Sequence, residues 1–248
     1  MIVDCHTHWG RCYTERDGLD PSRWLSVARV HGVTHAVVLP EASLINAGLV
    51  REDNDRVASV CARSGGAMIP FCTVNFWDQS EAVKEARRCL LDGPFRGVKS
   101  HPWTQACSTG LPAMDDVCEI AAEVGAPILF HDGTPPFSMP SQIALLARRH
   151  PRATVVLGHA GLFEYWREAI VSMRFASNLW ACLCGPYVAG IRAIWEQADR
   201  TRLVWGSDFG YGLADPIGYR LPLLREAGLN DAQIDCVLAE NAARLLRL

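Results

Sequence analysis

Residues 126–161 read APILFHDGTPPFSMPSQIALLARRHPRATVVLGHAG, and they contain one complete strand–helix–strand unit. The apolar run at 126–131 stops at a histidine, an amphipathic pattern covers 141–150, and a β-branched run at 153–161 ends soon after a second histidine. Short, nearly continuous apolar strands are typical of parallel strands that helices cover from the outside. The stretch therefore predicts a βαβ unit with polar residues at the strand ends.

The same alternation runs through the whole chain and predicts an α/β fold of the (β/α)8 TIM-barrel type. Eight apolar runs each precede an amphipathic pattern, and 248 residues is a usual length for this fold. An open, doubly wound sheet is the alternative, but no G-x-G-x-x-G follows any expected strand. No linker-like stretch appears, so we expect a single domain over 1–248. We expect strands at 1–8, 34–40, 67–75, 95–102, 126–131, 153–161, 178–184 and 202–210, and helices at 21–31, 53–64, 79–91, 114–124, 141–150, 163–175, 188–198, 216–227 and from 230.

The composition argues against several classes of protein. The net charge is −3 and no Lys/Arg run occurs, which disfavours a nucleic acid or an anionic membrane as partner. No apolar stretch reaches the roughly 18 residues of a membrane span, and the start of the chain lacks a signal-peptide pattern. The ten cysteines include no C-x-x-C pair. We therefore expect a cytoplasmic protein with a small-molecule substrate, and we leave open whether it forms a homo-oligomer.

Seven polar residues stand at the expected carboxyl ends of the strands, where TIM-barrel active sites are built. All but one of them can bind a metal or move a proton at neutral pH, and the lysine does so only once it loses its charge. With 248 residues over eight units, the end of the fifth strand falls about four units after His8, where His131 stands. The seven residues are His6, His8, Lys99, His101, His131, His159 and Asp208.

Four of these residues have the composition of a metal site. His6 and His8 are two residues apart on one strand, so their side chains point to the same face, about 6.6 Å apart along the chain. Three imidazoles and one carboxylate, with one position left open, describe a catalytic Zn²⁺ site better than a closed structural one. The pattern therefore predicts one divalent ion, with zinc as the expected metal, bound by His6, His8, His131 and Asp208.

The ordered motifs resemble those of the amidohydrolase superfamily, and specifically of its amidohydrolase-2 branch. The resemblance extends from residue 3 to residue 248. It implies a TIM-barrel enzyme in which the same four residues bind one divalent metal, while His159 orients the bound water or substrate or exchanges a proton with it. The matching pieces are VDCHTHWG, RGVKSHP, PILFHDGTPP, VVLGHAGL, WGSDFGYG and ENAARLLRL.

The resemblance covers hydrolases, hydratases and non-oxidative decarboxylases of aromatic or unsaturated carboxylic acids. We expect a hydrolase that acts on a small ester, lactone or amide through a metal-activated water. Asp208 would take the proton of the water, and His159 would protonate the leaving group or stabilise an oxyanion. A decarboxylase, in which the metal binds the substrate carboxylate or an adjacent hydroxyl, is the alternative. A catalytically inactive barrel used for binding is the third interpretation.

Lys99 and His101 are the expected substrate-binding residues. Lys99 can bind a substrate carboxylate, bridge two metals as a carboxylated lysine, or serve the structure alone. The motif GVKSHP favours a single-metal site with an unmodified amine. Aromatic residues after the strand ends could line an apolar substrate pocket, although each could also pack beneath a loop. These aromatic residues are Trp9, Trp103, Phe137, Phe209 and Tyr211.

Overall fold

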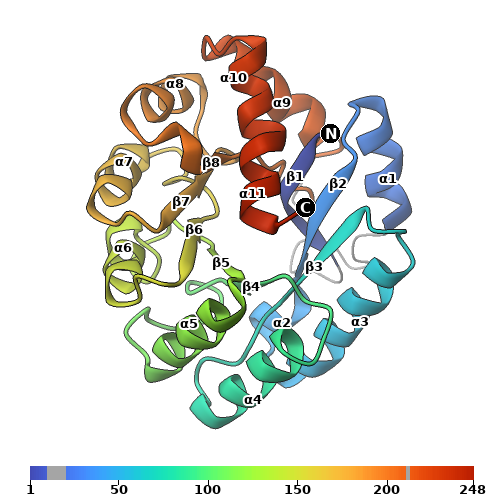
Figure 1. Ribbon diagram of the computed structural model, residues 1–248, viewed down its shortest axis with the longest axis vertical. Coiled ribbons are helices and arrows are strands. Elements are labelled where there is room, and N and C mark those ends of the chain that lie inside the picture. Colours follow the sequence, from blue (N-terminus) through green and yellow to red (C-terminus); the bar gives the residue numbers. More distant parts are fainter. Residues whose placement is uncertain (10–20, 211–212) are drawn as a thin grey trace.

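The computed structural model describes residues 1–9, 21–210 and 213–248, and its centre is one sheet of eight parallel strands (Figure 1). The strands follow one another in chain order, and the helices lie around the outside of the sheet. The strands are β1 (Val3–Trp9), β2 (His35–Pro40), β3 (Met68–Cys72), β4 (Gly97–Ser100), β5 (Pro127–Phe130), β6 (Thr154–Leu157), β7 (Leu179–Cys182) and β8 (Leu203–Val204).

The chain that follows β8 closes the barrel against β1. Strand β8 has only two residues, but Phe209 O, a few residues later, accepts a hydrogen bond from His8 N at 2.7 Å. Gly206 permits this approach, because a Cβ at that position would lie 2.6 Å from His6 Cβ. The predicted TIM barrel is therefore confirmed, and among the described residues 205–209 rather than β8 itself make the hydrogen bonds with β1.

The helices occupy the predicted places, and the main differences are these. The helix expected from 163 begins only at Trp166, after a turn in which Ala160, Gly161 and Leu162 all have positive φ. A short helix and a 3-10 turn that were not predicted follow β2, and a π-helical turn interrupts the last helix at Cys236–Glu240. None of the described helices is long and apolar enough to cross a membrane. The α-helices are α1 (Pro21–Val30), α2 (Ala42–Ile45), α3 (Val50–Ala62), α4 (Gln79–Leu90), α5 (Pro112–Val124), α6 (Pro140–Arg149), α7 (Trp166–Phe175), α8 (Val188–Gln197), α9 (Pro216–Glu226), α10 (Asp231–Asp235) and α11 (Asn241–Leu246).

Buried apolar side chains form two groups, one inside the barrel and one between the sheet and the helices. The inner group contains strand residues such as Val37, Phe71 and Leu129, together with Leu245 and Leu246 of α11. Helix α11 thus packs on the barrel interior and covers its amino-terminal end, where it crosses the centre of the view in Figure 1. The functional side chains predicted at the strand ends lie at the other, carboxyl end, which we call the mouth.

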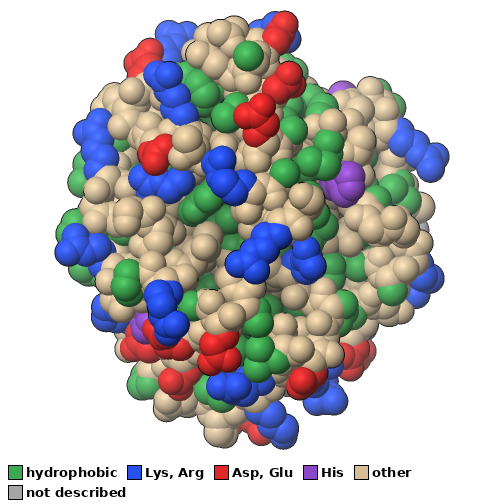
Figure 2. Space-filling model, viewed as in Figure 1, with side chains coloured by type: hydrophobic (Ala, Val, Ile, Leu, Met, Phe, Trp, Pro, Cys, Tyr) green, Lys and Arg blue, Asp and Glu red, His purple; other side chains and the backbone are tan. Residues whose placement is uncertain are grey.

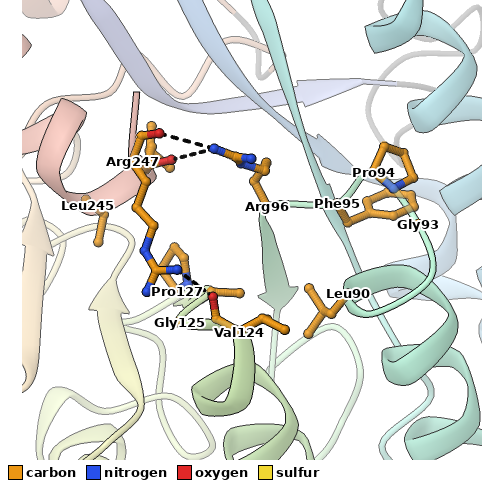
Figure 3. Close-up of a pocket in the computed structure, with 12 residues that line it drawn as sticks. Leu90, Gly93, Pro94, Phe95, Arg96, Val124, Gly125, Pro127, Leu245 and Arg247 are labelled. Carbon is orange, nitrogen blue, oxygen red and sulfur yellow. Dashed lines mark hydrogen bonds between the residues drawn. The ribbon is translucent and has the colours of Figure 1, made fainter.

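The covered end holds a pocket of about 270 Å³ between the approach to β4 and the ends of α5 and α11 (Figure 3). The two arginines that line it donate hydrogen bonds to backbone carbonyl oxygens. Arg96 donates to Arg247 O at 3.2 Å, and Arg247 donates to Val124 O, at the carboxyl end of α5, at 2.7 Å. These bonds tie the last helix to the barrel. Figure 2 shows charged side chains of both signs interspersed over this face.

Candidate metal centre and active site

Strand β1 carries His6 and His8 to the mouth with their rings facing each other. Both side chains are buried, and their Nε2 atoms lie 3.0 Å apart. The Nδ1–H of His6 donates to Gly158 O at 2.9 Å, because a carbonyl oxygen can only accept. Nδ1 of His8 lies 2.6 Å from a carboxylate oxygen of Glu41, which places its proton in the same way. With Nδ1 of each ring turned to an acceptor, the two Nε2 atoms face each other. Burial keeps His6 neutral by lowering its pKa. Burial also lowers the pKa of His8, but Glu41 and Asp208 raise it overall, so a metal ion at this point would replace a proton on Nε2 of His8.

Asp208 brings a third donor atom to the same point. Its Oδ1 lies 3.6 Å from His6 Nε2 and 3.4 Å from His8 Nε2, with no hydrogen-bond partner among the described residues. The residue has a φ of 58°, in the left-handed region that non-glycine residues rarely adopt, and its N–H is held by His6 O at 2.9 Å. Burial alone would raise the pKa of Asp208, but His159 and His8 lower it overall, so the side chain is a carboxylate at neutral pH.

These three donor atoms fit a divalent metal ion. Two imidazole nitrogens and a carboxylate oxygen are ligands that zinc and its neighbours in the first transition row accept. Their separations of 3.0 to 3.6 Å allow each of them to lie at about 2.0–2.2 Å from one shared ion. The buried carboxylate oxygen without a hydrogen-bond partner is the clearest sign, because such an atom is costly unless something positive approaches it.

His131, the fourth predicted ligand, lies beside this group, but Thr134 engages its Nε2. The two atoms, His131 Nε2 and Thr134 Oγ1, are 2.7 Å apart. The His131 ring stacks on that of His101, with 3.8 Å between the centroids. Burial and the charge of Lys99 lower the pKa of His131 to about 3. The structure thus gathers three of the four predicted ligands, and a ligand role for His131 stays a prediction that requires its ring to leave Thr134.

Lys99 places a cation beside the donor atoms. Its Nζ lies 3.3 Å from His6 Nε2, and the side chain is fully buried. Burial lowers the pKa of Lys99 to about 8, although Asp208 and Glu41 oppose the shift, so most of the amine is protonated at pH 7. His101, the other predicted substrate-binding residue, is buried too, and that burial lowers its pKa well below the ordinary value.

His159 follows β6 and is held by both its backbone and its ring. Its N–H donates to one carboxylate oxygen of Asp132 at 2.6 Å, and the N–H of Gly161 donates to the other at 2.6 Å. Its Nδ1 lies 3.2 Å from Cys184 Sγ. Burial lowers the pKa of His159 well below the ordinary value, so the ring is neutral at pH 7. A neutral imidazole can orient a substrate or accept a proton from it, which are two of the roles that the sequence suggested.

A family model described as amidohydrolase matches residues 3–248. The chain belongs to the amidohydrolase family. Five of the motifs that resembled this family in the sequence contain or directly follow strand ends at the mouth, and the sixth, ENAARLLRL, contains helix α11 at the covered end. None of the curated proteins compared with the chain matches it.

Solved structures share this amidohydrolase barrel over almost their whole length. A 5-carboxyvanillate decarboxylase from Sphingomonas paucimobilis is 16% identical, with 100% of this chain and 99% of that chain covered and a TM-score of 0.79. A dihydroxybenzoic acid decarboxylase from Polaromonas, with bound manganese and 2-nitroresorcinol, is 12% identical, with 100% and 97% covered and a TM-score of 0.78. A probable 2-pyrone-4,6-dicarboxylic acid hydrolase from Acinetobacter baumannii is 12% identical, with 100% and 99% covered and a TM-score of 0.75. At these identities the likeness shows the fold alone.

Three residues of the amidohydrolase site were not predicted. Glu41 directly follows β2 and Asp132 follows His131, so both stand at strand ends, where the search for polar residues could have found them. Cys184 closes the run expected as the seventh strand, where a cysteine is ordinarily a small hydrophobic residue. Its contact with His159 depends on the packing of two strand ends, which the sequence does not display.

Arg220 on α9 is a further cation near the mouth that the sequence did not single out. Its Nε is buried and has no hydrogen-bond partner among the described residues. Its positive charge acts on Asp208, after the larger influences of burial, His159 and His8. A guanidinium that has no ion pair with any carboxylate of the described residues is suited to an anionic group of a substrate.

The aromatic residues expected to line a pocket differ in how far they are buried. Trp9 and Phe209 are buried in the hydrophobic core. Phe137 is half-buried, and Trp103 is 49% exposed. Tyr211 lies outside the described residues.

Proposed function

We propose that this amidohydrolase is a metal-dependent, non-oxidative decarboxylase of a small aromatic or unsaturated carboxylic acid. The observation that carries the proposal is the buried cation of Lys99, whose Nζ lies 3.3 Å from His6 Nε2, where the donor atoms converge. A carboxylate bound there would meet a positive charge in a site shielded from water, where electrostatic attraction is strong. The matched decarboxylases favour the same class of reaction over the hydrolysis that the sequence alone led us to expect first.

We further propose that one divalent ion, with zinc as the expected metal, binds the side chains that converge at the mouth. His6, His8 and Asp208 would hold it, and His131 would join them once its ring leaves Thr134. When bound, the ion supplies a Lewis acid that withdraws negative charge from oxygen atoms of the substrate. Elemental analysis of protein purified without chelator would identify the ion, expected at one per chain.

The chain's own residues would perform the remaining steps. Lys99 binds the carboxylate that is lost, and Arg220 binds a second anionic group where the substrate has one. When the carbon–carbon bond breaks, CO₂ leaves and the electron pair stays on the substrate carbon, which takes a proton from the Lys99 ammonium. Solvent then restores that proton. Neutral His159 accepts a hydrogen bond from a substrate hydroxyl and so orients the ring.

The proposal is tested with metal-loaded protein and a panel of hydroxybenzoates and unsaturated acids that carry ¹³C in the carboxyl group. Esters, lactones and amides are assayed in parallel with a pH indicator. We expect labelled CO₂ from at least one acid, lost on chelation and in Asp208→Asn. Acid release from a lactone, ester or amide without CO₂ would make the protein a hydrolase. No turnover of either kind by metal-loaded protein would support the inactive barrel.

A further inference from the structure

We propose that Cys184 is a positioning residue that fixes which ring nitrogen of His159 carries the proton. In this arrangement Nδ1 of His159 is protonated and Nε2 keeps its lone pair, so His159 presents a hydrogen-bond acceptor to the substrate. The role of that acceptor in turnover rests on the proposed function, but the arrangement of the protons does not.

The single proton of the Cys184 thiol is placed by its contact with Gly158. Sγ lies 2.8 Å from Gly158 O, which is closer than van der Waals contact, and a carbonyl oxygen can only accept. The thiol proton must therefore lie between the two atoms. The other side of the sulfur therefore carries only lone pairs.

The ring of His159 meets that other side of the sulfur. Its Nδ1 lies 3.2 Å from Sγ, and two lone pairs would repel each other at this distance, so Nδ1 must carry the hydrogen that points at the sulfur. A neutral imidazole has one N–H, and therefore Nε2 of His159 is unprotonated. Nε2 makes no hydrogen bond with any of the described residues, which leaves it for a substrate.

The backbone around this contact is built for close approach. A Cβ on Gly185, the residue after Cys184, would collide with His159 O, so only glycine lets the end of β7 come this near to the chain after β6. Asp132 holds the backbone N–H of His159 at 2.6 Å from the other side. His159 is thus held through its backbone N–H by Asp132 and through its ring by the thiol of Cys184.

A second metal site is the competing explanation of the same cluster. One ring nitrogen of His6, one of His159 and Sγ of Cys184 lie within 4.8 Å of one another, as metal ligands would. However, the Nδ1–H of His6 and the thiol proton both point at Gly158 O. A metal ion there would have to displace both hydrogen bonds in a fully buried place, so the geometry favours a network of protons.

The experiment reads the protons directly, by long-range ¹H–¹⁵N correlation spectra of zinc-loaded protein labelled with ¹⁵N-histidine. The two neutral tautomers give different nitrogen shifts, and the signals of His159 are assigned by their loss in His159→Gln. We expect the Nδ1–H tautomer in the wild-type protein and in Cys184→Ser, whose hydroxyl can make the same two bonds. In Cys184→Ala the proton should redistribute toward Nε2. Cys118→Ala, which truncates an equally buried cysteine on α5, is the matched control and should change nothing at His159.

Kinetics give the second readout, provided that decarboxylation is found. Loss of an outer partner that orients a catalytic group typically costs about 10–100-fold, so kcat should fall by this factor in Cys184→Ala, while KM and metal content stay within about twofold. Cys184→Ser should restore kcat. An Nε2–H tautomer in the wild-type protein, an unchanged tautomer in Cys184→Ala, or two zinc ions per chain would each overturn the proposal. If the tautomer behaves as expected and no acid is decarboxylated, the proposed function fails and the positioning role stands.

Discussion

Histidines stand at both ends of this barrel, and their surroundings differ. At the mouth five histidine rings pack against one another, with centroid separations from 3.8 to 5.0 Å. At the opposite end His150 follows α6, and each of its ring nitrogens lies 2.7 Å from a carboxylate, one of Asp115 and one of Glu119. We call the first group the mouth histidines: His6, His8, His101, His131 and His159.

The difference shows what makes a histidine cluster available to a ligand. Both nitrogens of His150 are used by acids on α5, and Arg149 and Arg152 pair with the same acids, so the group is complete in itself. The mouth histidines outnumber the carboxylates near them. Burial lowers the pKa values of His6 and His159, which keeps their rings neutral, and their lone pairs point into shared space. A cation or a substrate can bind the histidine nitrogens at the mouth, whereas both ring nitrogens of His150 already contact carboxylates.

The largest expected effect comes from removing a metal ligand at the mouth. Asp208→Asn and His6→Ala should lose the bound ion and, with it, several kcal/mol of transition-state stabilisation, which lowers turnover about 10⁴-fold. His150→Ala should keep the ion and the activity. Elemental analysis of metal content, with turnover measured on the same samples, checks the prediction for all three variants. Full activity in metal-free protein would contradict the assignment of the mouth as a metal site.

The second prediction compares the roles of His159 and His131, which should differ in whether the variant keeps the metal. His159→Asn should lower turnover about 10²–10⁴-fold while metal content stays the same, because an acid–base or orienting group is lost but no ligand is. His131→Ala should lose the metal as well, if its ring leaves Thr134 to bind the ion. Equal metal loss in both variants would make the assigned roles wrong, and unchanged metal in His131→Ala would limit the ligands to the three that the structure gathers.

The sequence predicted the barrel and the places of the mouth residues because strand ends can be read from apolar runs. Two histidines spaced i and i+2 had to share a face, and His6 and His8 do converge. The direction in which a ring turns depends on side-chain rotamers and on neighbours from other strands, so the contact of His131 with Thr134 could not be predicted. Cys184 looked like a core residue for the same reason, because its partner lies on another strand.

A smaller effect is expected from Arg220, which lies near the mouth on α9. Arg220→Gln should raise KM for a substrate with a second anionic group about 10-fold, with kcat much less changed, because a charge-assisted hydrogen bond contributes about 1.5–3 kcal/mol. Arg220→Lys should recover part of the loss, since it keeps the charge without the fork of donors. A matched monoanionic substrate is the control and should show the same KM in all three proteins. An equal rise in KM for both substrates would show that Arg220 acts through the fold.

The smallest effect is expected at His150, and it is an effect on stability. The ring of His150 lowers the pKa of Glu119, and it helps to lower that of Asp115 against the burial that would raise it. Carboxyl groups whose pKa values are lower in the folded state stabilise it above the unfolded value of about 4, and this contribution is lost as the pH falls through the folded values.

His150→Gln should therefore lower the free energy of unfolding by about 0.5–1 kcal/mol at pH 7, the usual magnitude for ion pairs as exposed as these. The difference from the wild-type protein should shrink below pH ~4, where the acids of both proteins become protonated. Urea unfolding at several pH values measures this difference. His35→Gln is the control, because His35 contacts the hydroxyl of Thr34 and this variant leaves the ion pairs of Asp115 and Glu119 intact. If the difference for His150→Gln stayed constant down to pH ~2, the ring would stabilise the fold by packing. The ion pairs of His150 would then not be what distinguishes it from the mouth histidines.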